Sequence, residues 1–215
     1  AIADDGTIKA TGSSVSGNWL TCSTETGIMT AVTGFPFADV PTNAWYFGDA
    51  YYAYNNALFA GTGANTFSPN VTMTRGMLVT VLWRMEGSPK AAAPTFSDTR
   101  GIWCSEAVGW AAANGIVNGF DNNTFSPNGT VTREQMAAIL YRYAAFKGID
   151  VSAAADLGNF ADFESVSAYA RTAIAWASAE GIINGSADGR LMPKAGATRA
   201  QVAAILHRYI ENCIF

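Results

Sequence analysis

Residues 132–143, Thr-Arg-Glu-Gln-Met-Ala-Ala-Ile-Leu-Tyr-Arg-Tyr, decide the fold of this 215-residue chain. The spacing of Met136, Ile139, Leu140 and Tyr143 is i, i+3, i+4 and i+7, which predicts one apolar face of a helix. Thr132 is a favourable N-cap residue, and a Gln three positions later completes a capping box. The stretch therefore predicts a helix that begins at a defined residue and buries one side.

The same helix start occurs twice more. Thr74-Arg75-Gly76-Met77 lies 58 residues before it and Thr198-Arg199-Ala200-Gln201 lies 66 residues after it. Apolar residues follow both with the same spacing, so we expect three equivalent capped helices. The first start has Met77 where the others have Gln, and it therefore lacks the capping box.

Other features repeat in the same register. They are an aromatic residue at the start of an earlier helix, a glycine, and the Asp of a Phe-x-Asp motif that opens each unit: Trp45, Trp103 and Tyr169; Gly61, Gly119 and Gly185; Asp39, Asp98 and Asp162. The earlier helix ends at Gly115 in the second unit and at Gly181 in the third, as expected for a left-handed residue past a helix end. The first unit has Ala57 there, so we expect a different helix end. Gly61, Gly119 and Gly185 are expected to allow a backbone turn.

The repeats divide the chain into residues 35–92, 93–150 and 151–215, each a helix, a polar loop and a capped helix. We predict a mainly α fold with three helix-loop-helix repeats in a pseudo-threefold bundle. Residues 1–34 do not repeat and are rich in Thr, Ser and Gly. Possible strands at 7–9, 18–22 and 28–32 indicate the end of a preceding β-rich stalk or domain.

Composition excludes several classes of protein. The chain is 49% apolar and 14% charged, which indicates a folded protein, and its net charge of −4 argues against a general nucleic-acid binder. No apolar run reaches the roughly 18 residues of a membrane helix. The absence of an initial Met and of a signal peptide suggests a mature or excised piece.

Three cysteines, Cys22, Cys104 and Cys213, have no close spacing, which argues against zinc and against a disulfide scaffold. They are free thiols, or one disulfide with one spare thiol. The single histidine, His207, occupies a repeat position held by Trp83 and Tyr141, so it reads as a packing variant. We therefore expect no catalytic residues, no metal and no cofactor.

The motif set resembles the S-layer homology domain over residues 35–213. Each unit has Phe-x-Asp, an aromatic-Ala helix, a Gly, a Pro and a Thr-Arg helix start. The resemblance implies that the three capped helices meet and that the module anchors a surface protein to a bacterial cell wall, outside the cell. It further implies a secondary cell-wall polysaccharide ligand, often pyruvylated, or modified peptidoglycan, bound in grooves between units. The isolated module is expected to be a monomer, without nucleic acid or membrane insertion.

An acidic sugar needs a cation with fixed geometry near a helix start, where the helix dipole also favours an anion. The helix-start arginines Arg75, Arg133 and Arg199 suit this role, with the repeat aromatics as stacking plates and the repeat Asp and Gly residues shaping each groove. The structural alternative is that these arginines pair with Asp39, Asp98 and Asp162 and tie the units together. A second set, Arg84, Arg142 and Arg208, faces the opposite side of each helix, and we assign it to structure.

Two other functions remain open. The pseudo-threefold surface of the module suits a protein partner or self-assembly within a surface layer. An enzyme acting on wall glycans is the third reading, but equal repeats favour linked weak binding sites over three active sites.

Overall fold

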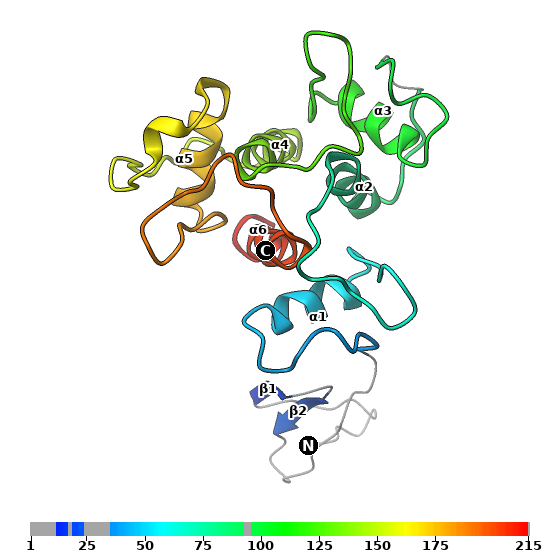
Figure 1. Ribbon diagram of the computed structural model, residues 1–215, viewed down its shortest axis with the longest axis vertical. Helices are drawn as coiled ribbons and strands as arrows, with labels where there is room; N and C mark the ends of the chain where they lie inside the picture. Colours follow the sequence, from blue (N-terminus) through cyan, green and yellow to red (C-terminus); the bar gives the residue numbers. More distant parts are fainter. Residues whose placement is uncertain (1–11, 17–18, 24–34, 93–95, 215) are drawn as a thin grey trace. The chain divides into compact units, whose positions relative to one another are not determined.

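The computed structural model describes residues 12–16, 19–23, 35–92 and 96–214. They form two compact units, residues 1–69 and 70–215, which we describe separately (Figure 1). Helices account for nearly all the regular structure, which confirms the mainly α class.

The first unit contains a hairpin and one helix. Strands β1 (Gly12–Ser16) and β2 (Trp19–Ser23) pair antiparallel, and helix α1 spans Phe47–Asn55. Strand β2 matches the strand expected at 18–22, whereas the strands expected at 7–9 and 28–32 lie outside the described residues. An aromatic cluster packs around α1, including Phe35 against Phe37 and Phe37 against Tyr54, with ring centroids 5.2 and 5.0 Å apart.

The second unit contains the other helices. These are α2 (Arg75–Met85), α3 (Ser105–Ala113), α4 (Arg133–Phe146), the 3-10 helices η1 (Phe163–Ser165) and η2 (Ala168–Ala170), α5 (Arg171–Ala179) and α6 (Arg199–Cys213). Helices α2, α4 and α6 are the three predicted capped helices and lie side by side in Figure 1.

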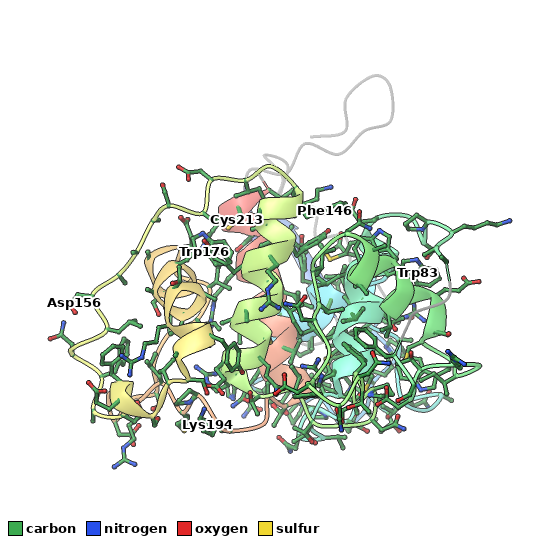
Figure 2. The ribbon with its side chains drawn as sticks, turned by 90° about the horizontal axis from the view of Figure 1, so that it is seen from above. Trp83, Phe146, Asp156, Trp176, Lys194 and Cys213 are labelled. Carbon is green, nitrogen blue, oxygen red and sulfur yellow. The ribbon has the colours of Figure 1, made fainter. Side chains whose placement is uncertain are left out.

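A cyclic set of backbone hydrogen bonds joins the segments that precede these helices. The amide of Met73 donates to the carbonyl of Ala197 at 2.9 Å, Ala197 donates to Val131 at 3.1 Å, and Val131 donates to Met73 at 2.9 Å. We call these three residues the central ring. Figure 2 shows Phe146 and Cys213, the last residues of α4 and α6, together at the end away from Lys194. The expected meeting of the three capped helices is therefore confirmed.

The helix caps are as predicted. The Thr132 and Thr198 side chains each accept a hydrogen bond in a complete capping box. Thr74 accepts from the Met77 amide at 3.2 Å without the reciprocal bond, because Met77 has no polar group to return it.

The apolar face of α4 lies in the core. Met136 and Leu140 are fully buried, and the Tyr143 ring lies 5.7 Å from that of Tyr209 on α6. The Tyr143 hydroxyl donates to Glu86, which also pairs with Lys147 at 2.9 Å. Burial and the Glu86 carboxylate raise the pKa of Tyr143. Helices α2 and α4 are thus joined at their carboxyl ends by a polar cluster as well as by packing.

The expectation for Ala57 was wrong. Ala57 has φ +55°, close to the +69° of Gly115 and the +67° of Gly181. The next amide closes the helix in the same way, because Leu58 donates to Ala53 at 2.9 Å and Ile116 donates to Ala111 at 2.8 Å. The first unit therefore keeps the repeat geometry and accepts the strain of a left-handed alanine.

The repeat glycines have a different structural reason from the expected turn. None of Gly61, Gly119 and Gly185 adopts the left-handed conformation. A Cβ atom on Gly119 would lie 2.3 Å from the ring of Phe96, and one on Gly61 or Gly185 would lie 2.4 Å from the ring of Phe37 or Phe160, respectively. Only glycine fits at these positions, because the Phe of the opening motif packs directly on the backbone there.

Two of the three cysteines have described side chains. Cys104 and Cys213 are free thiols, and burial raises the pKa of both, that of Cys213 to about 11. Across the described ranges, no cluster of His, Cys, Asp or Glu has the arrangement of a metal site. Nor is any helix in this part of the chain long and apolar enough to span a membrane.

Candidate functional site

The repeat aspartates organise the loop of their own repeat. The two carboxylate oxygens of Asp98 accept from the amides of Phe125 and Ser126 at 2.8 and 2.7 Å. Asp162 binds Leu191 and Met192 in the same way, and Asp39 binds Phe67 and Ser68. The second residue of each amide pair has a positive φ of 51–59°. The carboxylate thus holds a strained loop turn, and the pairing with the helix-start arginines considered as the structural alternative does not occur for Arg75 or Arg133 within the described residues.

Arg75 and Arg133 instead reach the loop of the following repeat through its carbonyl groups. Arg75 Nε donates to Phe125 at 2.8 Å and a terminal nitrogen donates to Asn118 at 3.4 Å. Arg133 makes the equivalent bonds to Leu191 at 2.7 Å and Asn184 at 2.9 Å. Each side chain is only 7% exposed, and loss of solvent lowers the pKa of both. These arginines therefore tie successive repeats together.

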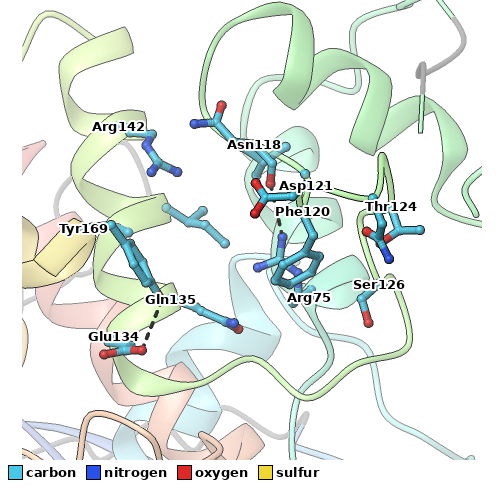
Figure 3. Close-up of a pocket in the computed structure, with 15 residues that line it drawn as sticks. Arg75, Asn118, Phe120, Asp121, Thr124, Ser126, Glu134, Gln135, Arg142 and Tyr169 are labelled. Atoms are coloured by element: carbon cyan, nitrogen blue, oxygen red, sulfur yellow. Dashed lines mark hydrogen bonds between the residues drawn. The ribbon is translucent and has the colours of Figure 1, made fainter. Parts of the chain in front are cut away.

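A pocket of about 960 Å³ lies beside Arg75, entirely within the second unit (Figure 3). We call it the Tyr169 groove. Its walls come from four elements: the start of α2, the loop after α3, one face of α4, and η2. The residues that line it include Arg75, Gly119, Phe120, Glu134, Arg142 and Tyr169.

Two arginines line the Tyr169 groove. Arg75 contributes from α2 and Arg142 from α4, and Figure 3 shows the Arg142 side chain directed into the groove. Arg142 is partly buried, and its guanidinium makes no hydrogen bond or ion pair with any described residue. Burial lowers the pKa of Arg75, and Tyr169 opposes this effect. The positive charge of Arg142 lowers that pKa further. The Asp121 carboxylate also lines this space, but it forms no ion pair with either arginine among the described residues. Two cations that face one space and are not paired with it favour an anionic ligand between them.

Arg142, which the sequence analysis assigned to structure, lines this groove. Arg133 and Arg142 do face different sides of α4, as the spacing predicts. The groove, however, lies between neighbouring capped helices, so it receives the helix-start arginine of α2 and the second arginine of α4 together.

Aromatic side chains form the two sides of the groove. Tyr169 is 55% exposed, and Phe120 on the facing loop is 46% exposed (Figure 3). The Arg75 guanidinium lies 5.0 Å from the Phe120 ring centre. Phe120 was not among the predicted site residues. It departs from the repeat, because the residue after the repeat glycine is Thr62 in the first unit and Ser186 in the third. Trp45 and Trp103 are 65% and 60% exposed, so all three repeat aromatics present ring surface to solvent.

Glu134 is the other residue that sequence reasoning missed. It is 4% exposed and accepts from the Lys194 ammonium at 2.7 Å, from both the amide and the hydroxyl of Ser167 at 3.0 Å, and from the Tyr169 hydroxyl at 3.2 Å. Loss of solvent raises the pKa of Glu134, but the bonds from Lys194 and Ser167 outweigh it and hold that pKa below its usual range. Its carboxylate is therefore already satisfied by protein groups.

The structure brings three of the predicted binding residues to this groove: Arg75, Gly119 and Tyr169. Asp98 holds the loop that forms one side. The remaining predicted residues of the second unit, Trp103, Arg133, Asp162, Gly185 and Arg199, lie outside it, and Asp39, Trp45 and Gly61 belong to the first unit. A binding role stays a prediction for all twelve residues, including those that line the groove.

Comparison with known families gives three matches to the S-layer homology domain. They cover residues 36–76, 95–137 and 159–203, together more than half of the chain. Each match begins just before a repeat aspartate and extends into the start of a capped helix.

Individual relatives include surface-layer proteins and enzymes. The chain is 32% identical over 172 residues to an endoglucanase of Bacillus sp. (strain KSM-635), covering 80% of this chain and 18% of the enzyme. It is 30% identical over 156 residues to the surface-layer 125 kDa protein of Lysinibacillus sphaericus, covering 71% of this chain and 13% of that protein. S-layer protein sap of Bacillus anthracis is 30% identical over 112 residues, covering 51% and 14%. The chain thus spans less than a fifth of the length of each of these relatives.

Proposed function

Because this chain belongs to the S-layer homology domain family, we propose that it is a non-catalytic module that binds an acidic secondary cell-wall polysaccharide and so anchors a longer protein to a bacterial wall. The family and the S-layer relatives indicate an extracellular, cell-surface location. The relatives that are named as enzymes match over a small fraction of their length, which is consistent with an attached module of separate role.

The observation that carries the proposal is the pair of arginines in the Tyr169 groove. Arg142 lacks a protein partner among the described residues, and Arg75 lies on the other side of the same space. A carboxylate-bearing sugar supplies the missing negative charge, and a planar guanidinium binds a carboxylate through two parallel hydrogen bonds. A pyruvylated sugar carries such a carboxylate on a rigid ring.

The aromatic sides of the groove support a carbohydrate over a simple anion. Tyr169 and Phe120 present exposed ring surface on opposite sides of the groove (Figure 3). Apolar ring faces with a few fixed polar groups are the usual composition of a small-molecule site. The sugar ring lies between the aromatics, and its acidic group lies toward Arg142.

The test is a pull-down of this chain with sacculi of Bacillus anthracis and Lysinibacillus sphaericus, before and after mild acid removal of the secondary polysaccharide. We expect stripped sacculi to lose binding. The released polymer should compete with unstripped sacculi for the chain. Binding that survives stripping would identify peptidoglycan as the ligand instead. Calorimetry with matched saccharides that carry or lack the pyruvyl group then tests the acidic substituent.

The second candidate is a protein-binding or self-assembly role in a surface layer, which the S-layer relatives favour. Failure to bind either preparation, together with concentration-dependent oligomers in gel filtration and cross-linking, would support it. The wall-binding proposal predicts a monomer at micromolar concentration.

A further inference from the structure

The start of α4, beside the Tyr169 groove, differs from the equivalent start of α2. In repeat 1 the second residue of the capped helix is Gly76, and a Cβ atom there would lie 2.9 Å from the Pro127 carbonyl, 3.0 Å from Cys104 Sγ and 3.3 Å from the Trp103 ring. That site is filled by the aromatic residue and the cysteine of the next repeat, and it leaves no room for a larger side chain.

At the start of α4 the corresponding residues are exchanged together. Glu134 replaces the glycine, Tyr169 replaces the tryptophan and Ala170 replaces the cysteine. The helix-start amide has the same neighbour, because Gly76 donates to Pro127 at 2.9 Å and Glu134 donates to Pro193 at 3.0 Å. The smaller Ala170 and the hydroxyl-bearing Tyr169 thus accommodate a carboxylate.

A fourth exchange neutralises that carboxylate. Lys194 stands where repeats 1 and 2 have Asn70 and Asn128, and its ammonium contacts Glu134 at 2.7 Å. A buried carboxylate is costly unless it is paired and hydrogen-bonded. Here the partners use both oxygens, so Glu134 has little capacity left to bind a ligand. Its remaining bond, to the Tyr169 hydroxyl, points to a role through the tyrosine.

We propose that Glu134 is a positioning residue for ligand binding in the Tyr169 groove: it holds the Tyr169 hydroxyl so that the ring stays fixed as one side of the groove, facing Phe120 and Arg142. Figure 3 shows this bond at the foot of the ring. A tryptophan at this position has no hydroxyl for the tether, so this arrangement selects tyrosine. The inference rests on the proposed binding of an acidic polysaccharide in this groove.

A fixed ring improves binding because an exposed side chain loses rotamer freedom when a ligand orders it. With Tyr169 already held, the sugar does not have to order it. Having to order a released side chain of this size on binding corresponds to a loss of affinity of up to about tenfold.

The experiment measures binding of the wall polysaccharide released from sacculi by calorimetry, with thermal unfolding of every variant. Tyr169→Phe removes only the tethering hydroxyl, and Glu134→Gln removes the acceptor charge at nearly constant size. We expect each to weaken binding by up to about tenfold, and the double variant to bind no more weakly than either alone, because both remove the same bond. Tyr141→Phe, which removes a hydroxyl on α4 outside the groove, is the matched control and is expected to bind like the wild type.

Arg142→Gln separates the inference from the proposed function. If Arg142→Gln abolishes binding while Tyr169→Phe and Glu134→Gln bind like the wild type, the positioning role is overturned and the proposed function stands. If the wild-type chain binds no wall polysaccharide, both fall. If Glu134→Gln and Tyr169→Phe lower the midpoint of thermal unfolding but leave affinity unchanged, the network is structural only, and the inference is overturned.

Discussion

The guanidinium of Arg75 lies 4.5 Å from the ring centre of Phe125 and also donates Nε to the carbonyl of the same residue at 2.8 Å. Arg75 thus contacts Phe125 in two ways, by stacking on its ring and by a hydrogen bond to its carbonyl. In the third repeat, Leu191 stands in the place of Phe125 and takes only the backbone bond, from Arg133 at 2.7 Å. The helix-start arginine is therefore a structural tie first, and the cation most accessible to a ligand in the Tyr169 groove is Arg142.

Substitution should separate these two arginine roles. We expect Arg75→Gln to lower the free energy of unfolding by about 3 kcal/mol, because it leaves the Phe125 and Asn118 carbonyls without their buried donor. We expect Arg142→Gln to change stability by less than about 1 kcal/mol and to weaken wall-polysaccharide binding at least tenfold. Urea denaturation and calorimetry measure the two effects.

Arg100→Gln is the control for loss of one positive charge, since Arg100 is exposed and outside the groove. It should leave both quantities unchanged. Equal losses of affinity in Arg100→Gln and Arg142→Gln would mean that net charge, and not the groove, governs binding.

Asp98→Asn should destabilise the second repeat. Its amide nitrogen would face the amide hydrogen of either Phe125 or Ser126, so one buried donor loses its acceptor, at a cost of about 2 kcal/mol. Thermal unfolding measures the change. Asp121→Asn, on the exposed surface of the same loop, is the control and should be close to neutral. A neutral Asp98→Asn would mean that water replaces the lost acceptor.

Acid should weaken the join between repeats 2 and 3. Hydrogen bonds from Lys194 and Ser167 outweigh the effect of burial and hold the pKa of Glu134 below its usual 4.5. A depressed carboxyl pKa contributes stability that is present above the unfolded value and is lost as pH falls through the folded value. Wild-type protein should therefore exceed Glu134→Gln in the free energy of unfolding at pH 7, and the difference should shrink below about pH 4.5. Urea denaturation from pH 7 to pH 3 measures it, and a constant difference would contradict this view of Glu134.

Ala57→Gly should stabilise the protein. Ala57 has φ +55°, a conformation that costs an alanine about 1 kcal/mol and a glycine almost nothing. Gly115→Ala is the reciprocal change at the equivalent position, where an added Cβ meets no atom within 4 Å, so only backbone strain is introduced. The two variants should shift the midpoint of thermal unfolding in opposite directions by a few degrees. Shifts of the same sign would show that the two helix ends differ in more than this residue.

Local signals predicted the helices well, because capping and apolar spacing act within one turn of the chain. Thr132 with Gln135, and the apolar face at Met136, behave as their spacing indicates. The repeat also predicted which residues are equivalent. It did not predict their partners, since those depend on which side of a neighbouring helix faces the groove.

Arg142 illustrates this limit. Its position opposite Arg133 on α4 was correct, but only the arrangement of α2 beside α4 places it near Arg75. Glu134 and Lys194 are 60 residues apart, and each looks like an isolated departure from its repeat. The structure shows that the two exchanged residues form an ion pair. Such paired exchanges are visible in sequence only after the repeats are superposed on a structure.

The central ring imposes an order on the making of this protein. Met73, Val131 and Ala197 each complete the hydrogen bonding of another, so no two repeats alone can close the ring. During synthesis the amide of Met73 must wait until Ala197 has left the ribosome, more than a hundred residues later. Closure over so long a loop is slow, because chain entropy opposes it before the contacts repay it. The nascent chain should thus keep its first two capped helices open to chaperones and proteases until the third arrives.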